Sequence, residues 1–176
     1  TSRRLFQEFF DKFSSTKIII NEKDIISRKF ERLYSEIFSH IDGTIREYVE
    51  RTMVTTCTYV TFVKRKIVIK ISVDKSDDSN IIKYLSMILF WLTIVSDYAP
   101  TSCSGTLNIT IMLSDLKKVL ATIQCPYTKN NCVMSKTCIN TGFSNQCSHI
   151  VIYRKEEWFK VFVHETFHNY GLDFFG

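Results

Sequence analysis

The sequence lacks an uncharged apolar run long enough to cross a bilayer. The longest one, residues 84–96 between Lys83 and Asp97, falls short of the ~20 residues that a membrane-spanning helix needs. Its length and composition indicate a central core helix instead. No membrane span is therefore expected.

Glycine is also scarce, with five in 176 residues. A basic nucleic-acid-binding face usually interleaves clusters of Lys and Arg with exposed aromatic residues and glycines. Here the formal net charge is +5, but Lys and Arg are spread among Asp and Glu, and the densest cluster is Lys64-Arg65-Lys66. This cluster is more typical of a solvated turn or strand edge than of a phosphate site, so we expect no nucleic-acid partner.

The chain has neither an initiating methionine nor a secretory signal, and it ends abruptly at Gly176. Its 176 residues, 45% hydrophobic and 14% aromatic, suffice for one domain with a full core and are too few for two of ordinary size. We expect a single domain over residues 1–176 that is truncated at its C-terminus. Residues 1–52 are expected to form a helical N-terminal part, and residues 53–176 to contain the sheet, a cysteine-rich loop at 125–147 and the last helix.

Hydrophobic periodicity predicts the order helix, helix, strands, helix, strand, cysteine-rich loop, strand, helix, and hence an α+β fold. The expected ranges are 5–13 and 25–38 for the first two helices, 55–73 for one long strand or a hairpin turning at residues 64–66, 84–96 for the core helix, 107–111 and 149–153 for two further strands, and a last helix that ends at Gly171. Asn21 and Asp24 are expected to cap the second helix.

One motif indicates a chemistry: His164-Glu165-Thr166-Phe167-His168. On a helix, histidines four residues apart stand one turn apart on the same face, close enough to hold one zinc ion, and the glutamate beside the first can reach a metal-bound water. The apolar residues of this helix fall on one arc, with the histidines on the opposite side. That arc consists of Phe159, Phe162, Val163, Phe167 and Tyr170. The helix is expected to bury this face and offer the other to a cleft; the alternative is an amphipathic helix whose histidines share a face incidentally.

Four of the six cysteines crowd into a polar loop, whereas Cys57 and Cys103 stand apart. The loop contains Cys125, Cys132, Cys138 and Cys147. The spacings contain no Cys-x-x-Cys pair, which argues against a structural zinc site, but disulfides, free thiols and metal all remain open. Because so polar a loop cannot secure itself by burial, we expect at least one cross-link among its four cysteines in an oxidising setting. Cys57 is expected to be a small core residue.

These residues carry a family resemblance. The motif resembles that of the zincin metallopeptidases, and residues 152–168 are similar to uncharacterised zinc-peptidase-like proteins of large cytoplasmic DNA viruses. The resemblance implies a zincin-like N-terminal subdomain, in which a mixed sheet carries the motif helix on one face and an edge strand holds an extended substrate, with additional N-terminal helices. It also implies that His164 and His168 bind zinc through neutral imidazole nitrogens. Glu165, which is not a ligand, would take a proton from the bound water as it attacks a peptide carbonyl.

The third zinc ligand departs from the family pattern. In the metzincin branch a histidine or aspartate falls three residues after the glycine, where this chain has Phe174, and Asp173 is one position early. Gluzincins take a glutamate from a later helix, and none follows in this sequence. Asp173 bends in as the third ligand, or the ligand lies beyond Gly176, or the site is incomplete; missing sequence is the favoured explanation.

Three functions are compatible with the sequence. The first is a zinc-dependent metallopeptidase with a protein or peptide substrate and zinc as its cofactor. The second is a structural or assembly protein of a virion that keeps a zincin-like fold without turnover and contacts other virion proteins. The third is a cysteine-stapled binding module in which the motif is incidental. The expected location is the cytoplasm, of an infected cell if the protein is viral, or the virion.

Overall fold

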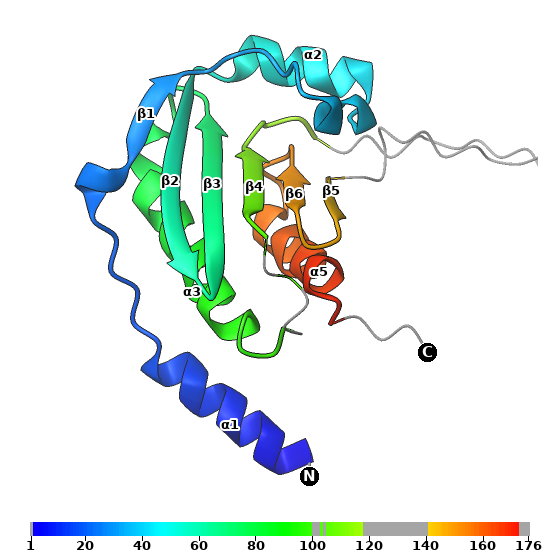
Figure 1. Ribbon diagram of the computed structural model, residues 1–176. Helices are drawn as coiled ribbons and strands as arrows, with labels where there is room; N and C mark the ends of the chain where they lie inside the picture. The colour runs from blue at the N-terminus through cyan, green and yellow to red at the C-terminus, as the bar shows by residue number, and fades with distance from the viewer. Residues whose placement is uncertain (1, 100–102, 104, 118–140, 173–176) are drawn as a thin grey trace, which may run out of the picture.

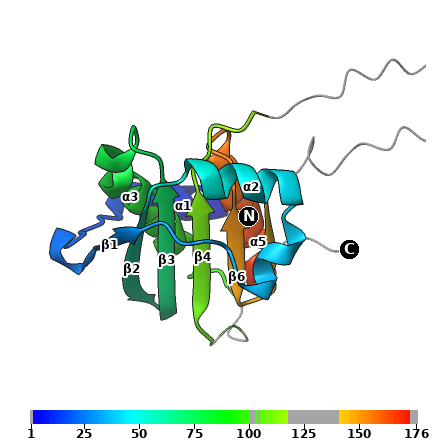
Figure 2. The same ribbon diagram turned by 90° about the horizontal axis from the view of Figure 1, so that it is seen from above.

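The computed structural model describes residues 2–99, 103, 105–117 and 141–172. Within these ranges the chain has an α+β fold with a six-stranded mixed sheet and four α-helices. Two of the helices, α3 (Ile81–Val95) and α5 (Trp158–Tyr170), lie behind the sheet in Figure 1. The opposite face carries no helix over most of its area, and α2 (Gly43–Thr52) lies across one end of the strands (Figure 2).

The sheet has the strand order β1-β2-β3-β4-β6-β5. Its strands are β1 (Ile26–Lys29), β2 (Thr55–Val63), β3 (Arg65–Val73), β4 (Leu107–Met112), β5 (Gly142–Asn145) and β6 (His149–Ile152). Strands β3, β4 and β6 run parallel to one another. Strand β2 is antiparallel to both of its neighbours, and β5 is an edge strand antiparallel to β6.

Residues 55–73 form the hairpin that was one of two predicted alternatives. The chain reverses at Lys64, whose φ of 58° lies in the left-handed region, and Val63 pairs with Arg65. In β3 the side chains alternate, as a strand requires. Ile67, Ile69 and Ile71 are fully buried toward the helices. Lys66 and Lys70, which occupy alternate positions, are exposed on the other face.

The apolar stretch predicted as a core helix is confirmed as α3. Its residues Leu85, Ile88 and Leu92 are buried in one hydrophobic cluster with the inward side chains of β3 and β4. By length and composition alone, residues 78–95 are apolar enough to cross a membrane, and buried core helices pass the same criterion. The burial of α3 against the sheet accounts for its apolar composition without a bilayer.

The predicted helix over residues 25–38 is wrong, whereas the first helix is confirmed as α1 (Ser2–Ser15). Asn21 caps a short 3-10 helix, η1 (Glu22–Asp24), and residues 26–29 then pair with β2 as β1. Strand pairing satisfies the backbone there, and the segment that follows β1, which includes the 3-10 helix η2 (Glu36–His40), still delivers its apolar side chains to a second cluster under α2. Those side chains are Phe30, Leu33, Ile37 and Phe38. Tertiary contacts thus override a helical spacing of apolar residues.

Candidate functional site

Helix α5 carries the histidine motif and lies against β5 and β6. It ends as predicted, because Gly171 adopts the left-handed conformation (φ 64°) and donates its N–H to the carbonyl of His168 at 3.2 Å. Phe162 is fully buried in the main cluster with Trp158 and Tyr170. These buried side chains fix the rotation of α5 about its own axis, and this rotation sets the directions of the motif side chains.

The residues that α5 buries differ in part from those predicted. Phe167, expected inside, is 37% exposed and forms a T-shaped ring pair with Trp91, at 5.8 Å between ring centroids. Polar side chains take up part of the buried face, because they find partners there. The buried residues of α5 are Trp158, Phe162, Glu165, Thr166, Asn169 and Tyr170. Hydrophobicity alone could not place these polar residues, since their partners come from other elements.

The two motif histidines converge on each other. Their Nε2 atoms lie 2.9 Å apart, with the rings nearly perpendicular, and His164 is exposed while His168 is half-buried. A tetrahedral zinc ion with Zn–N distances of about 2.0–2.1 Å would hold two such nitrogens about 3.4 Å apart. Separating the rings by about half an ångström would reach that spacing, so the pair fits two of the ligands of a zinc ion.

The third ligand is not found in the described part of the chain. No group of three or more His, Cys, Asp or Glu side chains converges there as a metal site. The sequence-based candidate, Asp173, lies outside the described residues. Zinc binding by His164 and His168 and the identity of a third ligand therefore both stay predictions.

Glu165 lies on the wall of a hollow between α5 and the edge strand β5. It is 9% exposed, and its Oε2 accepts a hydrogen bond from the hydroxyl of Ser144 at 2.7 Å. The hollow, of about 640 Å³, is lined by Gly142, Phe143, Ser144, Gln146, Glu165, His168 and Gly171. Strand β5 was missed at the sequence level, because its four residues fall inside the polar segment that was predicted as loop.

Asn169 fixes the last turn of α5 to the turn between β5 and β6. This fully buried amide donates to the carbonyls of Asn145 (2.6 Å) and His149 (3.3 Å), and its oxygen accepts from Nη2 of Arg65 at 2.9 Å. Arg65 also donates to the carbonyl of Cys147 at 2.6 Å. The prediction of a solvated turn or strand edge is thus wrong for Arg65, which is 3% exposed, whereas Lys64 and Lys66 are exposed as predicted.

A disulfide joins Cys147 to Cys103, a cysteine that the sequence had set apart. Cys103 precedes β4 and Cys147 precedes β6, and these strands are parallel neighbours, so their starting ends lie at the same edge of the sheet. The predicted partners of Cys147, namely Cys125, Cys132 and Cys138, lie outside the described residues. Cys57 is a buried free thiol, as predicted.

The first turn of α5 is held through the loop before it. Lys155 donates its N–H to the carbonyl of Ser114 at 2.8 Å, and its Nζ lies 2.5 Å from Oδ2 of Asp77. The hydroxyl of Tyr84, from α3, donates to the other oxygen of the same carboxylate at 3.1 Å. Both ends of the motif helix are therefore fixed by polar contacts to other elements.

Comparisons of this chain with protein families, curated proteins and solved structures found no match.

Proposed function

We propose that this protein is a zinc-dependent peptidase with a zincin-like site on α5. The observation that carries the proposal is the convergence of the His164 and His168 side chains, whose Nε2 atoms lie 2.9 Å apart. The two histidines are one helical turn apart, and Glu165 lies between them in the sequence. Two neutral imidazoles at this spacing match the donor set that zinc prefers. A peptidase further requires a base and a place for the peptide, and both have candidates beside the histidines.

Glu165 is the proposed general base. A bound zinc ion would act as a Lewis acid that polarises the peptide carbonyl and makes water a better nucleophile. Glu165 would accept the proton of the attacking water and then donate it to the leaving amine. Its bond to Ser144 holds the carboxylate on the wall of the hollow, facing the space that a substrate would enter.

Strand β5 is the proposed substrate-binding edge. Within the described residues it pairs with β6 alone, and its other edge is the one that an extended peptide would join. Ser144, which contacts Glu165, belongs to this strand, so a peptide added to the edge would pass the proposed base. Gly142 permits the close packing of β5, because a Cβ atom there would lie 2.6 Å from the carbonyl oxygen of Val151.

A structural or assembly role, as in a virion, is the second candidate. It is favoured by α1, which exposes Phe10 (55%) on a helix that extends away from the sheet (Figure 1), whereas Phe13 packs against Phe90 of α3. Exposed aromatic side chains of this kind suit contact with another protein. Under this proposal the site would bind zinc without turning over a substrate.

Digestion of a peptide library by the full-length protein separates the two candidates. Glu165→Gln should keep zinc and the fold, because the amide is nearly the same size, but should slow cleavage on the order of a hundredfold or more. Glu47→Gln, an exposed carboxylate on α2, serves as the matched control and should leave the rate unchanged. Chelator-sensitive cleavage that survives Glu165→Gln would refute the role of Glu165. Absence of cleavage despite bound zinc would favour the structural role.

A further inference from the structure

Positive charge is segregated in the sheet. The six strands of the described chain contain no Asp or Glu, but they carry five basic residues. These are Arg28, Lys29, Arg65, Lys66 and Lys70. The chain has 23 Lys and Arg residues, so 18 lie outside these strands, and they are matched in number by its 18 Asp and Glu residues. The net charge of +5 therefore equals the charge of the strands, although these basic residues do not form one cluster in the sequence.

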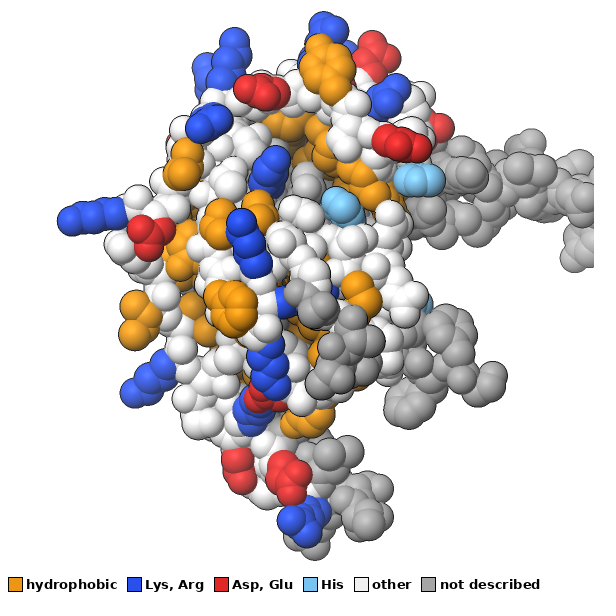
Figure 3. All heavy atoms as spheres, in the orientation of Figure 1, with side chains coloured by type: hydrophobic (Ala, Val, Ile, Leu, Met, Phe, Trp, Pro, Cys, Tyr) orange, Lys and Arg blue, Asp and Glu red, His pale blue; other side chains and the backbone are white. Residues whose placement is uncertain are grey.

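Most of this charge lies on the sheet face opposite α3 and α5. Because Ile67, Ile69 and Ile71 point toward the helices, Lys66 and Lys70 point the other way and are exposed. Arg28 is likewise exposed and pairs in register with Thr56. Figure 3 views this face, which shows Lys and Arg side chains over the sheet among polar and apolar atoms.

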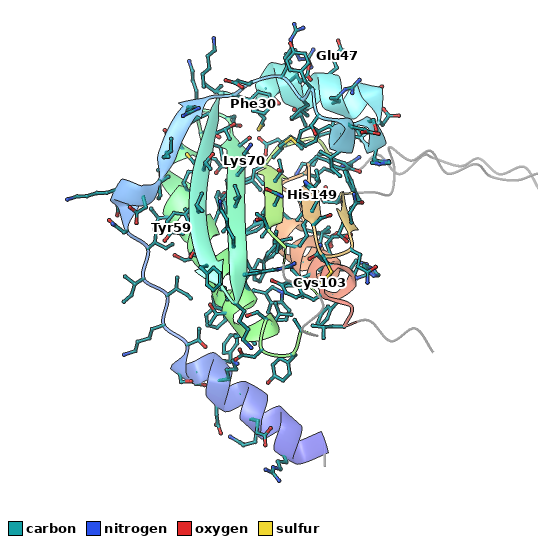
Figure 4. The ribbon with its side chains drawn as sticks, in the orientation of Figure 1. Phe30, Glu47, Tyr59, Lys70, Cys103 and His149 are labelled. Carbon is teal, nitrogen blue, oxygen red and sulfur yellow. A yellow bond between two sulfur atoms is a disulfide. The ribbon has the colours of Figure 1, made fainter. Side chains whose placement is uncertain are left out.

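Two of these cations, Arg28 and Lys70, line a recess of about 400 Å³. Its basic lining residues are Arg28, Lys29, Arg32 and Lys70, and its hydroxyl-bearing ones are Thr56, Thr58, Ser72 and Thr110. Glu31 is the sole carboxylate among the described residues that line it. Lys70 lies at mid-sheet, and Phe30, at the end of β1, lies nearer to α2 (Figure 4).

The cations of the recess have no counter-ion in the described protein. None of the four forms an ion pair there, in contrast to Lys12, Lys64 and Lys155 on other parts of the surface. Four cations beside a single carboxylate, that of Glu31, repel one another, and an anion that binds among them relieves this repulsion. Guanidinium and ammonium groups beside hydroxyl donors match the oxygens of a phosphate group.

We propose that this recess binds the phosphate group of a phosphorylated ligand. The site is independent of the proposed peptidase function, since it lies on the other face of the sheet from α5. Two sources share this chemistry, a small phosphorylated compound and the backbone of a single-stranded nucleic acid. The second is supported by Lys66 and by Phe62, which is 73% exposed on the same face and offers a ring for base stacking. No nucleic-acid partner was expected from the sequence, because Lys and Arg form no long run along the chain. The cations of the recess come from separate segments that folding brings together.

The test is a titration of the full chain with inorganic phosphate at constant ionic strength, followed by backbone amide NMR shifts. A nucleoside triphosphate and a fluorescent single-stranded oligonucleotide form two further arms. We expect saturable shifts in β2 and β3 around the recess, and we expect Lys70→Gln and Arg28→Gln each to weaken binding about tenfold or more. Lys83→Gln, an exposed lysine on α3, removes the same charge from the other layer and should leave the affinity unchanged.

The three arms identify the source of the phosphate. Tight, salt-sensitive oligonucleotide binding that phosphate competes away would assign the recess to a nucleic-acid backbone. Saturation by phosphate and triphosphate without oligonucleotide binding would assign it to a small compound. Shifts that stay linear in every arm, or an equal loss of binding in Lys83→Gln, would overturn the proposal.

Discussion

At the scale of single residues, the contact between Ser144 and Glu165 ties the edge strand to the motif helix. A hydrogen bond to a carboxylate contributes about 1.5–3 kcal/mol, and this one, at 2.7 Å, limits the directions in which Glu165 can point. We therefore predict that Ser144→Ala lowers kcat for the best library peptide about tenfold, with zinc content unchanged. Ser144→Thr keeps the hydroxyl and should retain most of the activity. An alanine variant with the wild-type kcat would show that Ser144 does not position Glu165.

The histidines and Glu165 could be predicted because their spacing lies within one helical turn. Ser144, Arg65 and Asn169 could not, because each acts through a partner that folding brings near. Arg65 and Asn169, for example, are separated by 104 positions in the chain. The difference between the predicted and the observed buried face of α5 has the same cause. Glu165 and Asn169 are buried because side chains from other elements provide their hydrogen-bond partners.

At the scale of elements, the start of α5 depends on the ion pair between Asp77 and Lys155. Burial raises the pKa of Asp77, but hydrogen bonds from Lys155, Asn80 and Tyr84 outweigh it and hold that pKa below its usual value. A carboxylate whose pKa is lowered by folding stabilises the protein above its unfolded pKa and loses this effect as the pH falls through its folded pKa.

We predict that Asp77→Asn lowers the free energy of unfolding by roughly 1–2 kcal/mol at neutral pH. The difference between wild type and variant should shrink between about pH 5 and pH 2, as Asp77 becomes protonated in the wild type. Urea denaturation at stepped pH measures this, with the exposed neighbour Asp78→Asn as the control. A difference that is independent of pH would contradict the assigned ion pair.

Elements with a strong and continuous pattern could be predicted, and those shaped by pairing could not. The hairpin of β2 and β3 and the helix α3 follow from alternation and from apolar content. Strand β5 has four residues and no alternation, and it exists because β6 provides its hydrogen bonds. Strand β1 likewise depends on β2, whereas the spacing of the apolar residues over 25–38 favoured a helix.

At the scale of the whole molecule, the disulfide joins two segments that start neighbouring parallel strands. Cys103 and Cys147 are 44 residues apart, and a loop of that length corresponds to about 2–4 kcal/mol of stabilisation, mainly by constraining the unfolded chain. We predict that replacing both cysteines by serine lowers the free energy of unfolding by this amount in denaturant titrations. A variant carrying serine at both positions but as stable as the oxidised wild type would show that the cross-link is absent in solution.

Zinc binding tests the central claim most directly. Metal-free full-length protein should take up close to one zinc ion per chain when titrated against a chromophoric chelator, and bound zinc should be lost in both His164→Ala and His168→Ala. Glu165→Gln, which alters the residue between the two ligands, should bind zinc as the wild type does. Equal zinc content in the wild type and both histidine variants would contradict a metal site on α5, and with it the proposed peptidase.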